Sequence, residues 1–219
     1  MIGIAEPFYS IGSFTEPLTS GATAMADIVL FHHIQGCTPG VVAIAEELTR
    51  AGHTVHLPDL FDGKVFTQLE DGFAHLQSLD AEGLRVRVDS TVEALPAELV
   101  YAGISWGVSH AQRLAQTRPG ARGALFFEAC FPVTGEWSFG PWPTGLPVQI
   151  HGMDQDEFFA LEGDLDAARE LVSAAGAPQA EVFTYNGNRH LFMDASLPSH
   201  DPAAARLALD RTRDFLTKI

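Results

Sequence analysis

A serine with glycines two positions away on either side lies near the middle of the chain. Residues 103–107 read Gly-Ile-Ser-Trp-Gly, and they follow the apolar run of residues 99–102. This pattern is typical of a nucleophile elbow, a sharp strand-to-helix turn that exposes a serine hydroxyl above a parallel sheet. The glycines have a steric reason, because the serine takes a strained backbone angle at which side chains at the flanking positions would collide with it. We therefore predict that Ser105 is the nucleophile of a covalent hydrolase.

A serine hydroxyl needs a base to remove its proton and a carboxylate to orient that base. In hydrolases that use this elbow, the acid and then the histidine follow the serine along the chain, each in a loop after a later strand. The apolar run 147–151 is followed by Asp154 and Asp156, and the run 181–185 is followed by His190. We therefore expect His190 to be the base, with the acid left open between the two aspartates.

An oxyanion hole requires two backbone N–H groups that face the negative charge developing on the attacked oxygen. One comes from the residue after the nucleophile, which is Trp106. The other comes from the loop after an early strand, residues 32–36, where Ile34 is the predicted donor.

A metal site is an alternative interpretation of the adjacent histidines His32 and His33. A metal needs further convergent ligands, however. His53 and His56 are three positions apart on a neighbouring predicted strand, so their side chains point to opposite faces. We therefore expect neither a metal nor a cofactor.

Three other interpretations compete with this one. His200 could be the base, but it follows Pro198-Ser199 at a helix start and fits an exposed cap better. Cys130 could be the nucleophile, but no glycines flank it at two residues' distance to expose its sulfur. The chain could also be a non-catalytic protein of the same fold that binds a small ligand. A degraded elbow or a missing partner would favour that last interpretation, and the sequence shows neither.

The elements that must position these groups alternate between strand and helix. Short apolar runs predict buried strands at 28–32, 53–57, 99–102, 123–127, 147–151 and 181–185. Helical periodicity is found at 41–48, 108–115, 161–172 and 205–219, and 62–96 is expected to be mostly helical with breaks at Gly72 and Gly83. Thr38 and Pro39 are the expected cap and first residue of the helix over 41–48. This alternation predicts an α/β fold with a parallel, doubly wound sheet and helices on both faces.

The chain of 219 residues fits one domain with a single core. Residues 1–24 differ from the rest, since they lack Lys and Arg and are rich in Ser, Thr, Gly and Pro. They have no basic start of the kind found in a secretory signal, and Met25 could be an alternative start. We therefore expect an N-terminal extension over 1–24 and one domain over 25–219.

The net charge of −15 disfavours binding to nucleic acid and to anionic membranes, because both are negatively charged. No apolar run approaches the roughly 18 residues of a membrane span. Cys37 and Cys130 are too few for a disulfide scaffold, and buried thiols in a cytoplasmic protein are expected. The expected partner is a small-molecule substrate, bound by a monomer or a homodimer.

Over residues 27–219 the chain resembles the dienelactone hydrolase family of α/β-hydrolases. The resemblance rests on the elbow and on the motifs His33-Ile34-Gln35-Gly36, Pro39-Gly40, Leu57-Pro58-Asp59-Leu60-Phe61, His151-Gly152, Gln155-Asp156 and His190-Leu191-Phe192. It implies hydrolysis of carboxylic esters or lactones through an acyl-enzyme, without a cofactor. It also places the triad acid on Asp156 rather than Asp154, and supports His190 as base and Ile34 and Trp106 as oxyanion donors.

Three departures from the family pattern bear on the substrate. Ser105 replaces the cysteine of founding members, His33 stands where they carry a glutamate, and Asp194 lies near the place of their substrate-binding arginine. An anionic dienelactone is therefore not the expected substrate.

A neutral pocket suits a general ester or lactone better than a carboxylate. His33 and the loop aromatics Trp137, Phe139 and Trp142 are candidates to line such a pocket. The alternative for these aromatic residues is that they pack onto the core.

Overall fold

The computed structural model describes residues 25–219, and the predicted extension over 1–24 lies outside the described residues. A six-stranded sheet has the order β2-β1-β3-β4-β5-β6, and every neighbouring pair of strands is parallel. The strands are β1 (Asp27–Phe31), β2 (Thr54–His56), β3 (Leu99–Ile104), β4 (Ala121–Phe127), β5 (Val148–Met153) and β6 (Ala180–Tyr185). Each of these strands overlaps one of the predicted apolar runs.

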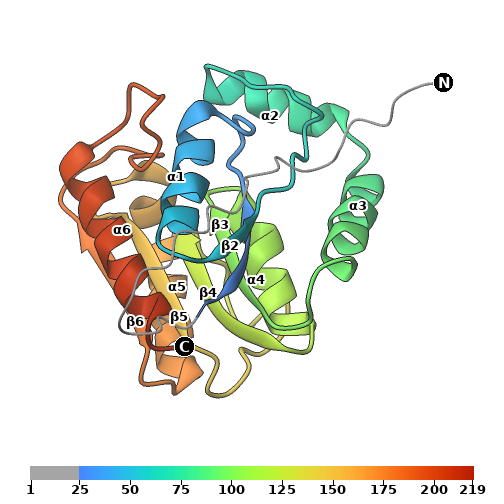
Figure 1. The fold of residues 1–219 in the computed structure, drawn as a ribbon. Helices are drawn as coiled ribbons and strands as arrows, with labels where there is room; N and C mark the ends of the chain where they lie inside the picture. The colour runs from blue at the N-terminus through green and yellow to red at the C-terminus, as the bar shows by residue number, and fades with distance from the viewer. Residues whose placement is uncertain (1–24) are drawn as a thin grey trace.

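Helices cover both faces of the sheet (Figure 1), which confirms the predicted doubly wound α/β fold. They are α1 (Pro39–Arg50), α2 (Leu69–Ser78), α3 (Ala81–Glu93), α4 (Gly107–Thr117), a π-helical turn η1 (Glu157–Leu161), α5 (Asp164–Ala175) and α6 (Pro202–Leu216). The buried side chains of α1 and α6 pack on one face, and those of α3, α4 and α5 pack on the other. The side chains of strand β1 alternate between the two faces. Ile28 and Leu30 point to the face covered by α1 and α6, and Val29 and Phe31 point to the face covered by α3, α4 and α5.

The first helix begins as the sequence predicts. The Thr38 hydroxyl accepts a hydrogen bond from the backbone N–H of Val41 at 3.2 Å, and Pro39 occupies the first helical position. This cap fixes the direction in which the chain leaves the loop after β1, the loop that contains the predicted oxyanion donor Ile34.

The predicted breaks at Gly72 and Gly83 are wrong, because helices run through both residues. The chain breaks instead at Leu79 and Asp80, where the Asp80 side chain caps α3 by accepting the N–H of Gly83. Gly72 is required by a tertiary contact, since a Cβ there would lie 2.3 Å from the carbonyl oxygen of Ile34. Helix α2 therefore packs directly against the loop after β1.

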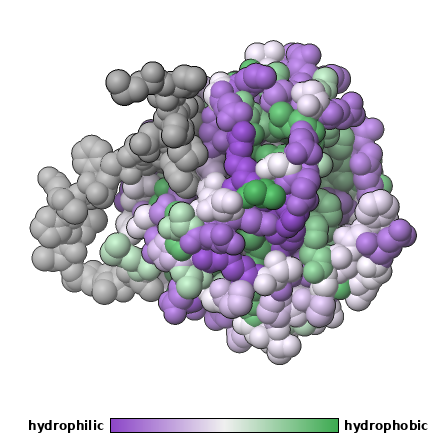
Figure 2. Space-filling view, turned by 90° about the vertical axis from the view of Figure 1, so that its right-hand side faces the viewer, coloured by the Kyte–Doolittle hydropathy of each residue, from purple (hydrophilic) through white to green (hydrophobic). Residues whose placement is uncertain are grey.

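The side of the molecule on which α3 lies is shown in Figure 2, with hydrophilic residues interspersed among smaller hydrophobic areas. On α3, Arg85 forms exposed ion pairs with Glu82 and Asp89. Among residues 25–219, no helix has the length and apolar character needed to cross a membrane.

The carboxyl ends of the six parallel strands lie at one edge of the sheet, which is where ligands bind in open α/β folds. The register there places Gly103 beside Phe31, and Phe127 beside both Ile104 and His151. The loops that follow β1, β3, β5 and β6 at this edge contain all the predicted triad and oxyanion residues.

Candidate active site

Ser105 follows β3 directly and takes the left-handed backbone conformation, with φ of 49°. Its backbone N–H donates to the carbonyl oxygen of Phe127 at 2.7 Å, which fixes the elbow to the neighbouring strand. A Cβ on Gly103 would lie 2.6 Å from the backbone of Gly107, and a Cβ on Gly107 would lie 2.4 Å from the carbonyl oxygen of Phe31. Both positions thus require glycine, as predicted, but the predicted reason is wrong: the clashes are with the start of α4 and the end of β1 and not with the serine.

A continuous chain of hydrogen bonds joins the three predicted triad residues. The Oγ of Ser105 lies 2.8 Å from Nε2 of His190, and Nδ1 of His190 lies 2.7 Å from Oδ2 of Asp156. Asp156 is fully buried, and its second oxygen accepts the backbone N–H of Phe158 at 3.0 Å. This pattern places the histidine proton on Nδ1 and leaves Nε2 free to accept the serine proton.

The competing residues lie elsewhere. Asp154 is exposed and accepts the backbone N–H of Gly187, so it does not contact His190. His200 lies in the turn before α6, where Asp201 is the helix cap. Cys130 is buried, and burial together with nearby carboxylates raises the pKa of its thiol well above the ordinary value. That sulfur is a poor nucleophile, because the thiolate is the reactive form.

The electrostatics around His190 favour its protonated form. Burial lowers the pKa of His190, but the hydrogen bond from Nδ1 to Asp156 and the charges of Glu128, Asp156 and Asp164 outweigh burial and raise it above the ordinary value. An imidazole in this environment accepts a proton readily and is stabilised as the imidazolium that forms when a serine attacks.

The two predicted oxyanion donors have free backbone N–H groups. Neither Ile34 nor Trp106 donates its N–H to a protein acceptor within residues 25–219. The turn that contains Ile34 is closed by a hydrogen bond from the N–H of Gly36 to the carbonyl oxygen of His33 at 3.0 Å. Trp106 precedes the first turn of α4, so its N–H lies at the positive end of a helix dipole.

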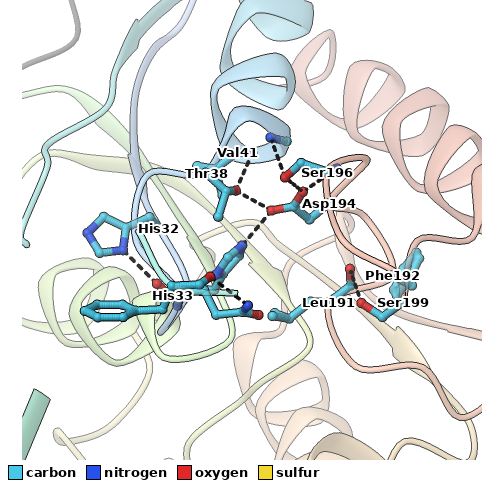
Figure 3. Close-up of polar contacts among 12 residues, drawn as sticks. His32, His33, Thr38, Val41, Leu191, Phe192, Asp194, Ser196 and Ser199 are labelled. Atoms are coloured by element: carbon cyan, nitrogen blue, oxygen red, sulfur yellow. Dashed lines mark hydrogen bonds and ion pairs between the residues drawn. The ribbon is translucent and has the colours of Figure 1, made fainter. Parts of the chain in front are cut away.

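The loop after β1 is tied to the loop after His190 by a buried pair (Figure 3). Nε2 of His33 donates to Oδ2 of Asp194 at 2.9 Å, while Nδ1 of His33 accepts the backbone N–H of Gln35 at 3.1 Å. The Asp194 carboxylate also accepts hydrogen bonds from the Thr38 hydroxyl and from the backbone N–H and hydroxyl of Ser196. Burial alone would raise the pKa of Asp194, but the hydrogen bonds from His33, Ser196 and Thr38 lower it to about 2.

Comparison with known proteins identifies the family to which the chain belongs. A model of the dienelactone hydrolase family matches residues 18–219. The chain belongs to the dienelactone hydrolase family. The resemblance seen in the sequence is therefore confirmed. No curated protein sequence gives a significant match.

Solved structures of low sequence identity share the fold of this dienelactone hydrolase family member. A protein of Klebsiella pneumoniae subsp. pneumoniae MGH 78578, assigned as a dienelactone hydrolase, gives a TM-score of 0.71 at 16% identity, covering 91% of this chain and 90% of its own. Thermogutta terrifontis esterase 2, phosphoramylated by tabun, gives 0.66 at 16% identity, with 90% and 84% covered. A dienelactone hydrolase-like promiscuous phosphotriesterase from metagenomic libraries gives 0.62 at 15% identity, with 90% and 88% covered. These likenesses show the α/β-hydrolase fold.

The residues predicted to line a pocket are not gathered in this family member. His33 is fully buried in its pair with Asp194. Trp142 is buried in the core, where its ring lies edge-on to Phe126 and its Nε1–H donates to a backbone carbonyl. Trp137 is 78% exposed, and Phe139 packs on another loop aromatic. The sequence left open whether Trp142 lines a pocket or packs onto the core, and in the structure it packs onto the core.

Within residues 25–219, one group of potential metal ligands comes together, formed by His32, Cys37 and Asp59. Both ring nitrogens of His32 already have backbone partners, since Nε2 accepts the N–H of Leu60 and Nδ1 contacts the carbonyl oxygen of His33. Burial raises the pKa of the Cys37 thiol far above its ordinary value, so the thiolate that a metal requires is disfavoured. These residues therefore do not fit a metal centre.

Glu128 is a buried residue of the site that the motifs did not indicate. It follows β4 directly, is fully buried, and accepts the backbone N–H of Phe192 on Oε1 at 2.6 Å. An acidic residue at the carboxyl end of an apolar strand was the signal available in the sequence.

Proposed function

We propose that this chain hydrolyses neutral carboxylic esters or lactones through an acyl-enzyme intermediate. The observation that supports this most directly is the hydrogen-bond chain from Ser105 through His190 to Asp156, with distances of 2.8 and 2.7 Å. The family supports hydrolase chemistry, and each residue lies in the loop where an α/β-hydrolase requires it.

In the first half of the proposed reaction, Oγ of Ser105 attacks the carbonyl carbon while Nε2 of His190 takes the hydroxyl proton. Asp156 holds the imidazole and stabilises its positive charge. The N–H groups of Ile34 and Trp106 donate to the oxyanion of the tetrahedral intermediate. The intermediate then collapses, the alkoxide leaves with the proton from His190, and the acyl group remains on the serine.

The second half repeats these steps with water. His190 removes a proton from a water molecule, and the resulting hydroxide attacks the acyl carbon. Collapse of the second tetrahedral intermediate returns the proton from His190 to Oγ of Ser105 and releases the carboxylic acid. The cycle needs no metal or redox cofactor, because every proton is carried by the same imidazole.

The charges near the triad indicate which substrates fit. Asp156 and Asp164 act on His190, and the Asp194 carboxylate lies in the same loop as His190, hydrogen-bonded to His33. A substrate carboxylate would meet the like charges of these aspartates there. We therefore expect p-nitrophenyl acetate to react at least about 10-fold faster, by kcat/KM, than the p-nitrophenyl hemisuccinate anion; a strong preference for the anion would contradict this part of the proposal.

The test uses a fluorophosphonate probe, which reacts covalently with activated serines, followed by peptide mass mapping. We expect the probe on Ser105, and we expect Ser105→Ala to lower kcat/KM for p-nitrophenyl acetate by at least about 10³-fold. Ser173→Ala, on the exposed side of α5, is the matched control and should behave as wild type. Wild-type protein that neither labels nor turns over any of these esters would instead favour a non-catalytic ligand-binding protein of this fold.

A further inference from the structure

The Glu128 carboxyl group is buried beside the triad and has no role in the mechanism above. Glu128 takes the left-handed conformation with φ of 64°, which residues other than glycine adopt rarely. Its side chain is fully buried, and Oε2 has no hydrogen-bond partner among the described residues. A strained backbone and an unpartnered buried carboxyl oxygen are both unfavourable, and such features concentrate at functional sites.

The end of β4 fastens the loops on which the proposed reaction depends. The carbonyl oxygen of Phe127 accepts the N–H of Ser105 at 2.7 Å, which holds the elbow. The N–H of Glu128 donates to the carbonyl oxygen of His151 at 2.6 Å, near the end of the strand that leads to Asp156. The side chain of Glu128 accepts the N–H of Phe192 at 2.6 Å. Two consecutive residues thus hold the elbow, the end of β5 and the loop of the base.

The loop that contains His190 has an unusual backbone that a hydrogen bond of this kind would hold in place. Phe192 is two positions after His190, and Leu191 between them also has a left-handed backbone, with φ of 62°. The side chains of Leu191 and Phe192, the two residues after His190, are both buried in the core. The bond from Phe192 to Glu128 therefore fixes the chain direction immediately after the imidazole.

The Glu128 carboxyl group also acts on the imidazole through its charge. The charged groups that act on His190 are Asp156 after β5, Glu128 after β4 and Asp164 at the start of α5. Those that act on Glu128 are His190 and Asp156. Burial raises the pKa of Glu128 to about 8, against the positive charge of His190, so this carboxyl group and the imidazole titrate as a coupled pair.

We propose that Glu128 is a positioning residue for the base: its carboxyl group holds the His190 loop through the N–H of Phe192 and places a second acid beside the imidazole that Asp156 orients. This inference rests on the proposed function, in which His190 is the base. It assigns to Glu128 a part in the reaction that packing alone would not require.

The variants Glu128→Gln and Glu128→Ala separate the two contributions, with Glu181→Gln at an exposed position of β6 as the matched control. The glutamine keeps an oxygen that can accept from Phe192 but loses the charge, whereas the alanine loses both. We expect kcat for p-nitrophenyl acetate to fall about 10-fold or more in E128A and less in E128Q, with KM nearly unchanged. The rate of fluorophosphonate labelling should fall in the same order.

The pH profile shows whether the charge matters. Removal of a carboxyl group can only withdraw negative charge from His190, so the acid limb of kcat/KM should move to lower pH in E128Q. Wild-type rates in E128A would overturn the proposal. So would equal losses in both variants with an unchanged pH profile, because that result indicates packing alone.

A measurement independent of turnover separates this inference from the proposed function. In protein with ¹³C-labelled histidine, the His190 resonance is assigned with a His190→Asn variant and titrated in wild type and in E128Q. We expect a lower pKa for His190 in E128Q, even if E128A fails to fold. Identical titration curves would overturn the role of Glu128, whereas a wild-type protein that does not label at Ser105 would overturn the proposed function.

Discussion

Nε2 of His33 donates a hydrogen bond to Oδ2 of Asp194 across 161 positions of sequence, with both side chains buried. His33 precedes the predicted oxyanion donor Ile34, and Asp194 follows His190 by four residues. The pair therefore fixes the distance between the loop that would bind the oxyanion and the loop that carries the base. Its two members come from the ends of β1 and β6, which are not neighbours in the sheet.

Replacement of Asp194 tests this link. We expect Asp194→Ala to lower the free energy of unfolding by about 2–4 kcal/mol, because it leaves buried donors on His33, Thr38 and Ser196 without an acceptor. We also expect kcat to fall. Asp210→Ala, which removes an exposed ion pair with Arg213, should cost at most about 1 kcal/mol in urea unfolding. Equal stability of the two variants would contradict the link.

The acid limb of the pH–rate profile should report the environment of His190. The base is active only when neutral, so kcat/KM rises with pH until the imidazole has lost its proton. Because the pKa of His190 is raised, we expect this limb above the ordinary titration range of histidine. Asp156→Asn should move the limb to lower pH and reduce kcat by up to about 10⁴-fold.

Asp154→Asn is the matched control for that experiment, since Asp154 accepts the N–H of Gly187 rather than a proton of the base. Its profile should superimpose on that of the wild type. A limb that shifts in D154N and not in D156N would show that Asp154, and not Asp156, is the acid.

Substitution of Gly72 tests the contact between α2 and the loop after β1. A Cβ at this position would lie 2.3 Å from the carbonyl oxygen of Ile34, and backbone atoms on both sides cannot easily move apart. We expect Gly72→Ala to lower the free energy of unfolding by about 1–3 kcal/mol and to lower kcat as the loop shifts. In Gly83→Ala the nearest atom belongs to the Asp80 side chain, which can rotate. That variant should stay within about 1 kcal/mol of the wild type in stability, because the gain in helix propensity offsets the displaced cap, and its kcat should not change, as measured by denaturation and ester hydrolysis.

Two buried histidines should make the protein sensitive to acid. Burial lowers the pKa of His32 to about 4 and that of His151 to about 3. The unfolded chain binds these protons near the ordinary pKa of about 6.5, so it holds more protons than the folded chain at pH 5. The free energy of unfolding should therefore fall as the pH falls below about 6.5, by roughly 3 kcal/mol for each residue between pH 6.5 and 4.

Denaturant titrations at pH 7, 6, 5 and 4 measure that slope. His151 stacks on the rings of Phe127 and Phe183, so His151→Phe retains an aromatic ring at the site. The variant loses the hydrogen bonds to Tyr185 and Gln149 and should be less stable at pH 7. Its stability should nevertheless depend less on pH between 4 and 6.5, and an unchanged slope would refute the assignment.

The sequence predicts most of the fold because apolar runs and turn residues carry local information. Each buried strand shows as an apolar run, and the cap at Thr38 and Pro39 follows from local chemistry. The order of Ser105, Asp156 and His190 could be predicted because parallel strands end at a common edge. The choice of Asp156 over Asp154 required the resemblance to the family.

What the sequence does not predict depends on contacts between distant segments. Gly72 resembles a helix breaker until the carbonyl oxygen of Ile34 is placed against it. Trp142 resembles a pocket residue until its ring is seen edge-on to Phe126 in the core. The pairing of His33 with Asp194 and of Glu128 with Phe192 joins loops from different strands, and no local pattern indicates either contact.

The burial of both cysteines has a consequence for how the protein tolerates its surroundings. Cys37 and Cys130 are unpaired thiols inside the fold, and burial disfavours the thiolate of each. Oxidants and alkylating reagents attack exposed thiolates. The elbow of this protein has a serine, and both cysteine sulfur atoms are shielded by the fold. The folded protein should therefore keep its activity in peroxide or iodoacetamide, under conditions that would inactivate an enzyme with a cysteine at the elbow.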